Sequence, residues 1–136
     1  MGDITGVEIL HTGLAVPDEE TAHEVFEGLF GLEPAGGMEI PGEITEALFR
    51  VGGGARIMHY RADNAMFEIF IRPGVVNTPG GFGHVCLIVR DRDAVIEKAE
   101  SMGFEIRRYT GGNRDVAFVV DRCGNIYEIK QARGNV

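Results

Sequence analysis

An approximate internal repeat limits the fold of this chain more than any other feature of its sequence. The segment His11–Val16 (HTGLAV) is matched by His84–Val89 (HVCLIV). Further along, Phe67–Ile69 (FEI) is matched by Tyr127–Ile129 (YEI). In each half an acidic helix start follows the first motif. The repeat therefore predicts two similar modules, each with a histidine near its first strand and a glutamate near its last.

Periodicity predicts a βαβββ arrangement for each module. Residues 7–16 are rich in apolar and β-branched side chains, and Asp18 is a good N-cap for a helix that reaches about Gly31. We expect further strands over 45–51, 55–61 and 65–72 in the first module, strands over 82–90, 105–109, 115–121 and 125–131 in the second, and a second helix over about 91–102. Turns are expected at Gly52–Gly54 and Asp63–Asn64 in the first module, and at Gly111–Asn113 and Cys123–Asn125 in the second.

The whole chain is expected to form one α+β domain of two modules, about 5–75 and 82–132, joined by a linker at Pro79–Gly81. Strongly curved mixed sheets, each with a helix on its convex face, would form a cleft. The 136 residues, 44% of them hydrophobic, are enough for one core.

Charge and hydropathy exclude several classes of protein. The net charge of −8 argues against a nucleic acid partner, because phosphate binding needs clustered Lys and Arg. No apolar run approaches the roughly 20 residues that span a bilayer, and the first residues do not resemble a secretory signal. The two cysteines, Cys86 and Cys123, form no CxxC motif and are expected to be reduced thiols. We therefore expect a cytoplasmic protein without a membrane partner.

Strand alternation places both histidines opposite the packed faces. On the first strand His11 shares a face with Gly13 and Ala15, whereas the other face is apolar. His84 shares a face with Cys86, again opposite apolar residues. Each repeated glutamate lies between two apolar residues, so it also opposes the packed face of its strand.

A carboxylate in the middle of an apolar strand is costly unless it is paired or bound to metal. Each of these residues taken alone is more often a satisfied core or surface group, but two matched His–Glu pairs favour a common partner. One divalent cation, Zn, Ni or Co, with Mn or Fe as alternatives, would satisfy the whole set. The predicted metal ligands are His11, Glu68, His84 and Glu128.

Other polar residues are weaker candidates. His59 can line the pocket, but an ordinary surface role is favoured. His23, on the first helix among glutamates, is interpreted as a solvated residue. Cys86 lacks an activating cluster and is interpreted as a thiol that lines the pocket rather than a nucleophile. Five arginines are candidates for binding an anionic substrate tail, although most are expected to be solvated: Arg50, Arg56, Arg72, Arg107 and Arg108.

These motifs resemble the vicinal oxygen chelate superfamily, which includes glyoxalase I, methylmalonyl-CoA epimerase, extradiol dioxygenases and bleomycin resistance proteins. The resemblance covers nearly the whole chain. Residues 117–129 resemble the family's closing hairpin, Asp-Pro-x-Gly-Asn-x-x-Glu, with Arg122 in place of the proline. The resemblance implies a glyoxalase-like fold and places the family's metal ligands at His11, Glu68, His84 and Glu128.

The ligand set is similar to that of bacterial glyoxalase I, whereas epimerases usually have Gln where this chain has Glu68. The two positions that bind the glutathione carboxylates in glyoxalase I hold Ala15 and Arg72. The stretch 67–73, followed by Gly83-His84, is more similar to the epimerases. Extradiol dioxygenases use two histidines and one glutamate, so Glu68 argues against that activity.

The resemblance implies a metal-dependent lyase or isomerase of the glyoxalase I or epimerase type, similar to lactoylglutathione lyase. Such an enzyme binds a small substrate through two adjacent oxygens, stabilises an enediolate or enolate and moves a proton next to a carbonyl. Glu128 is expected to be the principal base, with Glu68 opposite it. A homodimer is expected, and the site could lie within one chain or between two. The alternative is a metal-free small-molecule or drug-binding protein of the bleomycin-resistance type.

Overall fold

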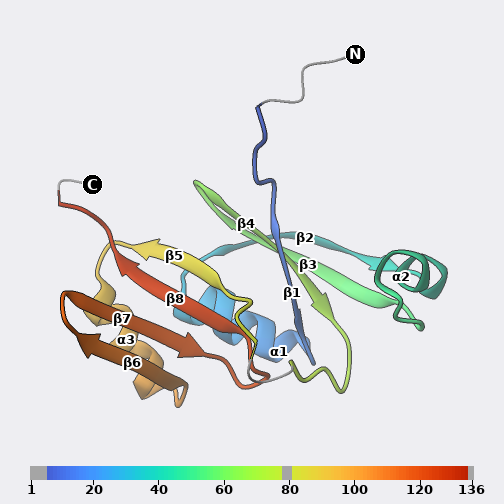
Figure 1. Ribbon diagram of the computed structural model, residues 1–136. Coiled ribbons are helices and arrows are strands. Elements are labelled where there is room, and N and C mark those ends of the chain that lie inside the picture. Colours follow the sequence, from blue (N-terminus) through green and yellow to red (C-terminus); the bar gives the residue numbers. More distant parts are fainter. Residues whose placement is uncertain (1–5, 78–80, 135–136) are drawn as a thin grey trace.

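The computed structural model describes residues 6–77 and 81–134, which form two four-stranded mixed sheets (Figure 1). The first sheet has the order β1-β4-β3-β2 and the second the order β5-β8-β7-β6. In both, the first strand of the half runs parallel to the last, and the remaining pairs are antiparallel. The two sheets thus have the same topology, and the predicted α+β fold is confirmed.

The first half contains β1 (Thr12–Val16), α1 (Glu19–Ala22), the π-helical segment η1 (His23–Leu29), β2 (Glu33–Ile40), α2 (Gly42–Phe49), β3 (Ala55–Ala62) and β4 (Ala65–Ile71). The second half contains β5 (Val85–Val89), α3 (Arg92–Ser101), β6 (Glu105–Gly111), β7 (Arg114–Val120) and β8 (Ile126–Gln131).

The predicted N-cap Asp18 is confirmed, and Asp91 caps the second helix in the same way. The Asp18 side chain accepts a hydrogen bond from the Thr21 backbone N–H at 2.7 Å, and Asp91 accepts one from Ala94 at 3.1 Å. Both caps satisfy a backbone donor that a helix start leaves without an intrahelical partner. They begin α1 and α3 at equivalent points of the two halves.

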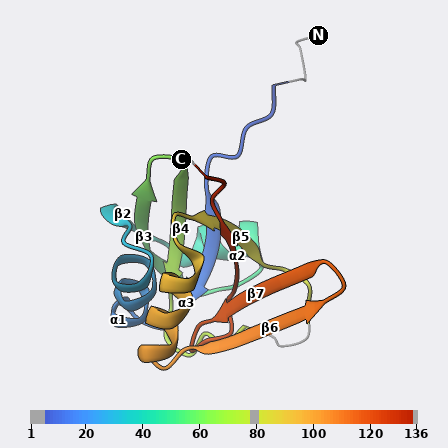
Figure 2. The same cartoon turned by 90° about the vertical axis from the view of Figure 1, so that its left-hand side faces the viewer.

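The core lies between the halves, around the helix α1–η1 (Figures 1 and 2). Phe26 of η1 is fully buried and contacts Phe67 of β4 and Tyr127 of β8 through its ring. Phe30, just after η1, also packs on Tyr127. One helix therefore covers a face of both sheets, and the glutamates between the packed residues of β4 and β8 lie on the opposite, open faces.

One predicted strand is wrong. Residues 45–51 were expected to be a strand, but Gly42–Phe49 is the helix α2, and the missing strand is β2, Glu33–Ile40. The segment EPAGGMEI has no clear alternation and contains two glycines and a proline, so its sequence gives no strand signal. It is an edge strand, held by hydrogen bonds to β3, with an irregular register between Pro34 and Gly37.

Other boundaries differ less. The strands expected over 7–16 and 82–90 begin at Thr12 and Val85, and the first helix continues as a π-helical segment. Pro79 and Gly80 of the expected linker lie outside the described residues. None of the helices that the structure describes combines the length and apolar character needed to cross a bilayer.

Candidate functional site

In the first half, Glu68 of β4 lies between two imidazoles. Its carboxylate oxygens are 3.5 Å from Nε2 of His11 and 3.1 Å from Nε2 of His59. His11 lies immediately before β1, which runs parallel to β4, and His59 is directly opposite Glu68 on β3. The side chain of Glu68 is 22% exposed, so this cluster lies partly sheltered on the open face of the first sheet.

In the second half, Glu128 of β8 has the equivalent position. Its Oε1 lies 3.1 Å from Nε2 of His84, and Lys130 Nζ lies 3.8 Å from its other oxygen. The residue opposite Glu128 on the neighbouring strand is Phe118, and the His84 ring stacks on it at 5.4 Å between ring centroids. The second half thus has one histidine–glutamate pair, with an aromatic ring where the first half has His59.

The backbone fixes which nitrogen of His84 faces the glutamate. Nδ1 lies 2.8 Å from the carbonyl oxygen of Phe82, and because a carbonyl only accepts, Nδ1 carries a hydrogen. The bond to the Phe82 carbonyl and the bond to Glu128 raise the pKa of His84. After loss of one proton, Nε2 would present its lone pair, which is the form that binds metals.

The structure brings together two of the four predicted ligands in each half, His11 with Glu68 and His84 with Glu128. Over residues 6–77 and 81–134, no three His, Cys, Asp or Glu side chains are arranged to hold a metal ion. Each pair therefore interacts within its own sheet.

Sequence reasoning undervalued His59. The signal was present, because His59 and Glu68 lie at equal separations on either side of the Asp63–Asn64 turn. A tight hairpin at that turn must place them opposite one another on the same face, as the observed register does. The sequence gives no strand signal for β2, but the pairing of His59 with Glu68 across β3 and β4 does not depend on that strand.

The thiols show no sign of activation. Burial, with Asp121 nearby, raises the pKa of Cys123 to about 12. Cys86 is exposed on the open face opposite Glu128, and its pKa is also raised, first by desolvation and then by that carboxylate. Because a nucleophilic cysteine needs a lowered pKa, neither is suited to covalent catalysis.

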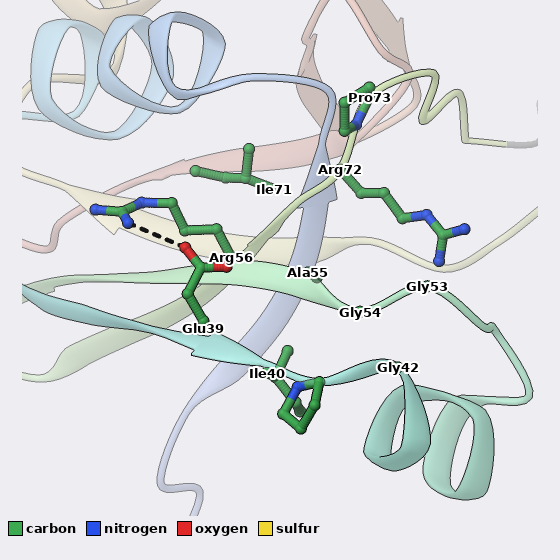
Figure 3. A pocket seen from close by; sticks show the side chains of 11 residues that line it. Glu39, Ile40, Gly42, Gly53, Gly54, Ala55, Arg56, Ile71, Arg72 and Pro73 are labelled. Carbon is green, nitrogen blue, oxygen red and sulfur yellow. Dashed lines mark hydrogen bonds and ion pairs between the residues drawn. The ribbon is translucent and has the colours of Figure 1, made fainter.

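A cavity of about 420 Å³ adjoins the first cluster along the same sheet face. Gly13, which is the register partner of Glu68, lines its near end. Phe70 of β4, Phe49 of α2 and Arg72 continue the lining away from Glu68. Arg72 also borders a second, more open hollow of about 610 Å³ between β2, α2 and β3 (Figure 3).

The model of the Glyoxalase/Bleomycin resistance protein/Dioxygenase superfamily matches residues 10–118. The chain belongs to this superfamily. No curated protein matches the sequence significantly.

Solved structures of the glyoxalase superfamily have the same fold. A glyoxalase family protein from Bacillus cereus has a TM-score of 0.70 at 15% identity, over 97% of this chain and 100% of that one. Glyoxalase I from Leishmania major has a TM-score of 0.69 at 17% identity, over 93% and 87%. A fosfomycin resistance protein from Mesorhizobium loti has a TM-score of 0.66 at 17% identity, over 97% and 95%. Because these identities are low, the likeness establishes the fold alone.

Proposed function

We propose that this protein is a divalent-metal-dependent lyase or isomerase of the glyoxalase I or epimerase type, with His11, Glu68, His84 and Glu128 as its metal ligands. One observation carries the proposal. The two sheets place a histidine Nε2 beside a glutamate oxygen at equivalent positions, at 3.5 Å in the first half and 3.1 Å in the second. Two imidazoles and two carboxylates are a donor set that suits Zn, Ni, Co, Mn or Fe.

The chemistry of each pair fits a metal ion. Both glutamate side chains are more than three-quarters buried, and a cation stabilises a carboxylate that is largely removed from water. The Nδ1–H of His84 donates to a backbone carbonyl, an arrangement that orients a ligating imidazole and leaves Nε2 for the metal. In each pair the ligand atoms already face one another.

We propose further that the complete site forms between two copies of the chain, with His11 and Glu68 from one and His84 and Glu128 from the other. Each pair lies on its own sheet, and among the described residues neither is part of a group of three ligands that could hold a metal ion, so we infer that a partner completes each of them. Large apolar side chains are exposed on these faces, namely Ile88 (73%), Tyr109 (62%) and Met38 (55%). Exposed apolar residues of this kind favour burial in a homodimer.

In the proposed reaction, Glu128 removes a proton from the carbon next to a substrate carbonyl and becomes a neutral acid, and Glu68, protonated at the start of the reaction, gives its proton back from the opposite side. The bound cation would supply Lewis-acid stabilisation of negative charge on a substrate with two adjacent oxygens. His84 and His11 would hold the cation beside the two carboxylates through Nε2. Glyoxalase I and lactoylglutathione lyase are among the structurally similar proteins, which supports this type of activity.

Metal content tests the proposal directly. Protein purified without chelators should contain one divalent ion per chain by elemental analysis. Titration of Zn, Ni and Co into the metal-free protein should show binding that is weakened at least about tenfold by Ala at His11, Glu68, His84 or Glu128, since even changes around ligands have effects of this size. If Glu68→Ala and Glu128→Ala both bind metal like the parent, the site is wrong and the metal-free binding protein becomes the better interpretation.

A mixing experiment tests the shared site. Glu68→Ala and Glu128→Ala chains, each defective alone, should regain about a quarter of the parent's metal binding when they are unfolded together and refolded, because about half of the dimers are mixed. The mixed dimer would combine both mutations in one site and leave the other site intact. If every site lay within one chain, mixing would restore nothing. Light scattering that shows only monomers at micromolar concentration would also contradict the shared site.

A further inference from the structure

We propose that α2 belongs to a flap, residues 43–51, which opens to admit an uncharged apolar group into the 420 Å³ cavity and then closes over it. None of the contacts that hold this flap closed, described below, involves a proposed metal ligand. The proposal therefore goes beyond the proposed function and does not rest on it.

The two halves differ at the connection that carries the flap. In the second half β6 ends at Gly111 and β7 begins at Arg114, so the connection is short. In the first half residues 41–54 lie between β2 and β3, and α2 is found at the end of the first sheet, away from the second (Figure 1). Because β6 and β7 pair without such an insertion, a sheet of this topology does not need α2 in order to form.

The flap is weakly attached to the rest of the protein. Of the eight residues of α2, Thr45 alone is buried, and the apolar side chains of Leu48 and Phe49 are 71% and 52% exposed. α2 also lacks the side-chain N-cap that begins α1 and α3. A helix of this length is not stable on its own, so α2 depends on a small contact area and can open locally.

Two contacts hold the flap closed. Thr45 Oγ1 donates to the Gly42 carbonyl at 3.2 Å and accepts a hydrogen bond from the buried Gly54 N–H at 3.1 Å. Phe49 meets Phe70 of β4 edge to face, with 5.2 Å between the ring centroids. Opening the flap would break the hydrogen bond between Thr45 and Gly54 and separate the two rings.

Glycines form the base on which the flap would turn. A Cβ at Gly42 would lie 3.0 Å from the Gly53 nitrogen, and a Cβ at Gly54 would lie 2.6 Å from the carbonyl oxygen of Ile40. The two ends of the insertion therefore meet backbone to backbone, which only glycine permits. Gly53 and Gly54 also have positive φ angles of 94° and 74°, so the backbone at this end is of the kind that changes direction readily.

The closed form has a cost that opening would remove. The guanidinium of Arg72 lies against Gly53, where a Cβ would be 3.3 Å from Nη2 (Figure 3). Nη1 of Arg72 is buried and has no hydrogen-bond partner among the residues that the structure describes. A buried donor of a charged group without an acceptor is unfavourable. Because Arg72 also lines the cavity, opening the flap would let water reach this nitrogen.

The lining of the cavity determines what the flap would close over. Apolar side chains come from α2, from the segment after it, from β4 and from the segment after β4: Phe49, Val51, Phe70 and Val75. The side-chain amides of Asn77 and Asn125 are engaged, since both donate to the carbonyl of Ala15. An uncharged apolar group fits this lining, and its burial beneath the flap would offset the cost at Arg72.

Hydrogen–deuterium exchange of the full-length protein, measured by mass spectrometry, tests the proposal without any assay of turnover. Amides of residues 43–51 should exchange at least about tenfold faster than those of β3 and β4, because a helix this short unfolds when it is released. The probe is N-phenyl-1-naphthylamine, an uncharged apolar dye. At about ten times its dissociation constant it should slow exchange of the flap by about tenfold and leave β6 and β7 unchanged.

Two variants should change the opening in opposite directions. Thr45→Val should speed exchange of the flap by about tenfold, because the valine keeps the size of the side chain but leaves the Gly54 N–H without an acceptor. Arg72→Met should slow it at least about threefold, because it removes the buried donor that has no partner. Thr110→Val, the same change at an exposed threonine of β6, is the matched control and should have no effect on the flap.

Four results would each overturn the proposal. The flap could exchange no faster than β3 and β4, or the dye could fail to slow its exchange. Thr45→Val could speed exchange of the flap and of β3 and β4 equally, which would be general destabilisation, or Arg72→Met could speed exchange of the flap. Failure of the parent protein to bind a metal ion would contradict only the proposed function.

Discussion

The two halves have the same topology but surround their glutamates differently. Glu68 contacts two imidazoles, His11 and His59, whereas Glu128 contacts one, His84. The residue opposite each glutamate on the neighbouring strand is His59 in the first half and Phe118 in the second. The repeat therefore preserves the His–Glu pair but changes what surrounds it, from a second polar contact in the first half to aromatic stacking in the second.

The second pair is also more firmly oriented. His84 is held by the Phe82 carbonyl at Nδ1 and by Phe118 at its ring face, so its Nε2 direction is fixed. Glu68 is instead shared between two nitrogens, and each oxygen has its own partner. We interpret the second half as the better oriented one, which suits Glu128 as the base.

The largest expected effect separates the roles of the two glutamates. Glu128→Gln should retain metal and slow proton transfer by about 10²- to 10⁴-fold, because the amide keeps an oxygen but cannot accept the proton. Glu68→Gln should slow it less. The measurement is deuterium exchange next to the carbonyl in the hemithioacetal of methylglyoxal and glutathione and in methylmalonyl-CoA. A greater loss in Glu68→Gln would assign the base to the first half.

The next largest effect tests whether His59 supports Glu68 or binds the metal. His59→Phe gives the first half the residue that the second half has at Phe118. We expect this variant to lower Zn affinity by no more than about tenfold, and His11→Ala to lower it further, since only His11 is a proposed ligand. Calorimetry of both variants decides the point. If the two variants lose Zn affinity equally, His59 is itself a metal ligand, and the two halves do not contribute equivalent ligands.

A smaller effect concerns pH. The raised pKa of His84 means that its imidazole keeps a proton to a higher pH than an ordinary histidine. A protonated imidazole cannot bind metal, so Zn affinity should increase as the pH rises through that raised pKa, and His84→Ala should flatten this increase. Titrations between about pH 6 and about pH 8 cover the range. If Zn affinity still rises with pH in the His84→Ala variant, a group other than His84 controls the pH dependence.

The smallest effect concerns stability and compares the buried tyrosines of the halves. The Tyr60 hydroxyl contacts His23 Nδ1 at 2.7 Å, and the Tyr127 hydroxyl donates to Asp121 at 3.0 Å. Burial raises the pKa of Tyr60 to about 12, so its hydroxyl stays protonated beside His23. His23→Ala should lower the free energy of unfolding by about 1–2 kcal/mol, measured in urea, because a buried hydroxyl loses its partner.

Metal binding by His23→Ala should be unchanged, since His23 lies on the helix away from the open faces. Adding Tyr60→Phe should recover part of the lost stability by removing the hydroxyl. A change in metal affinity in the single variant would show that the helix is coupled to the site.

Much of this architecture was predictable from the sequence. The repeat predicted two halves of like topology, and alternation placed the glutamates of β4 and β8 opposite the packed residues, as observed. These predictions succeeded because period-two burial and helix capping depend on neighbours within a few residues of the chain. The pairing of His59 with Glu68 belongs to the same class, since one tight turn determines it.

Only the tertiary structure decided the rest. The edge strand β2 forms because β3 offers it backbone hydrogen bonds, and its own residues do not favour a strand. The burial of Nη1 of Arg72 depends on Gly53, nineteen residues earlier in the chain, and on a cavity beneath α2. The two sheets are held together by one helix, because Phe26 of η1 packs against Phe67 of β4 and Tyr127 of β8. Each of these depends on contacts between distant segments, which local patterns in a sequence do not encode.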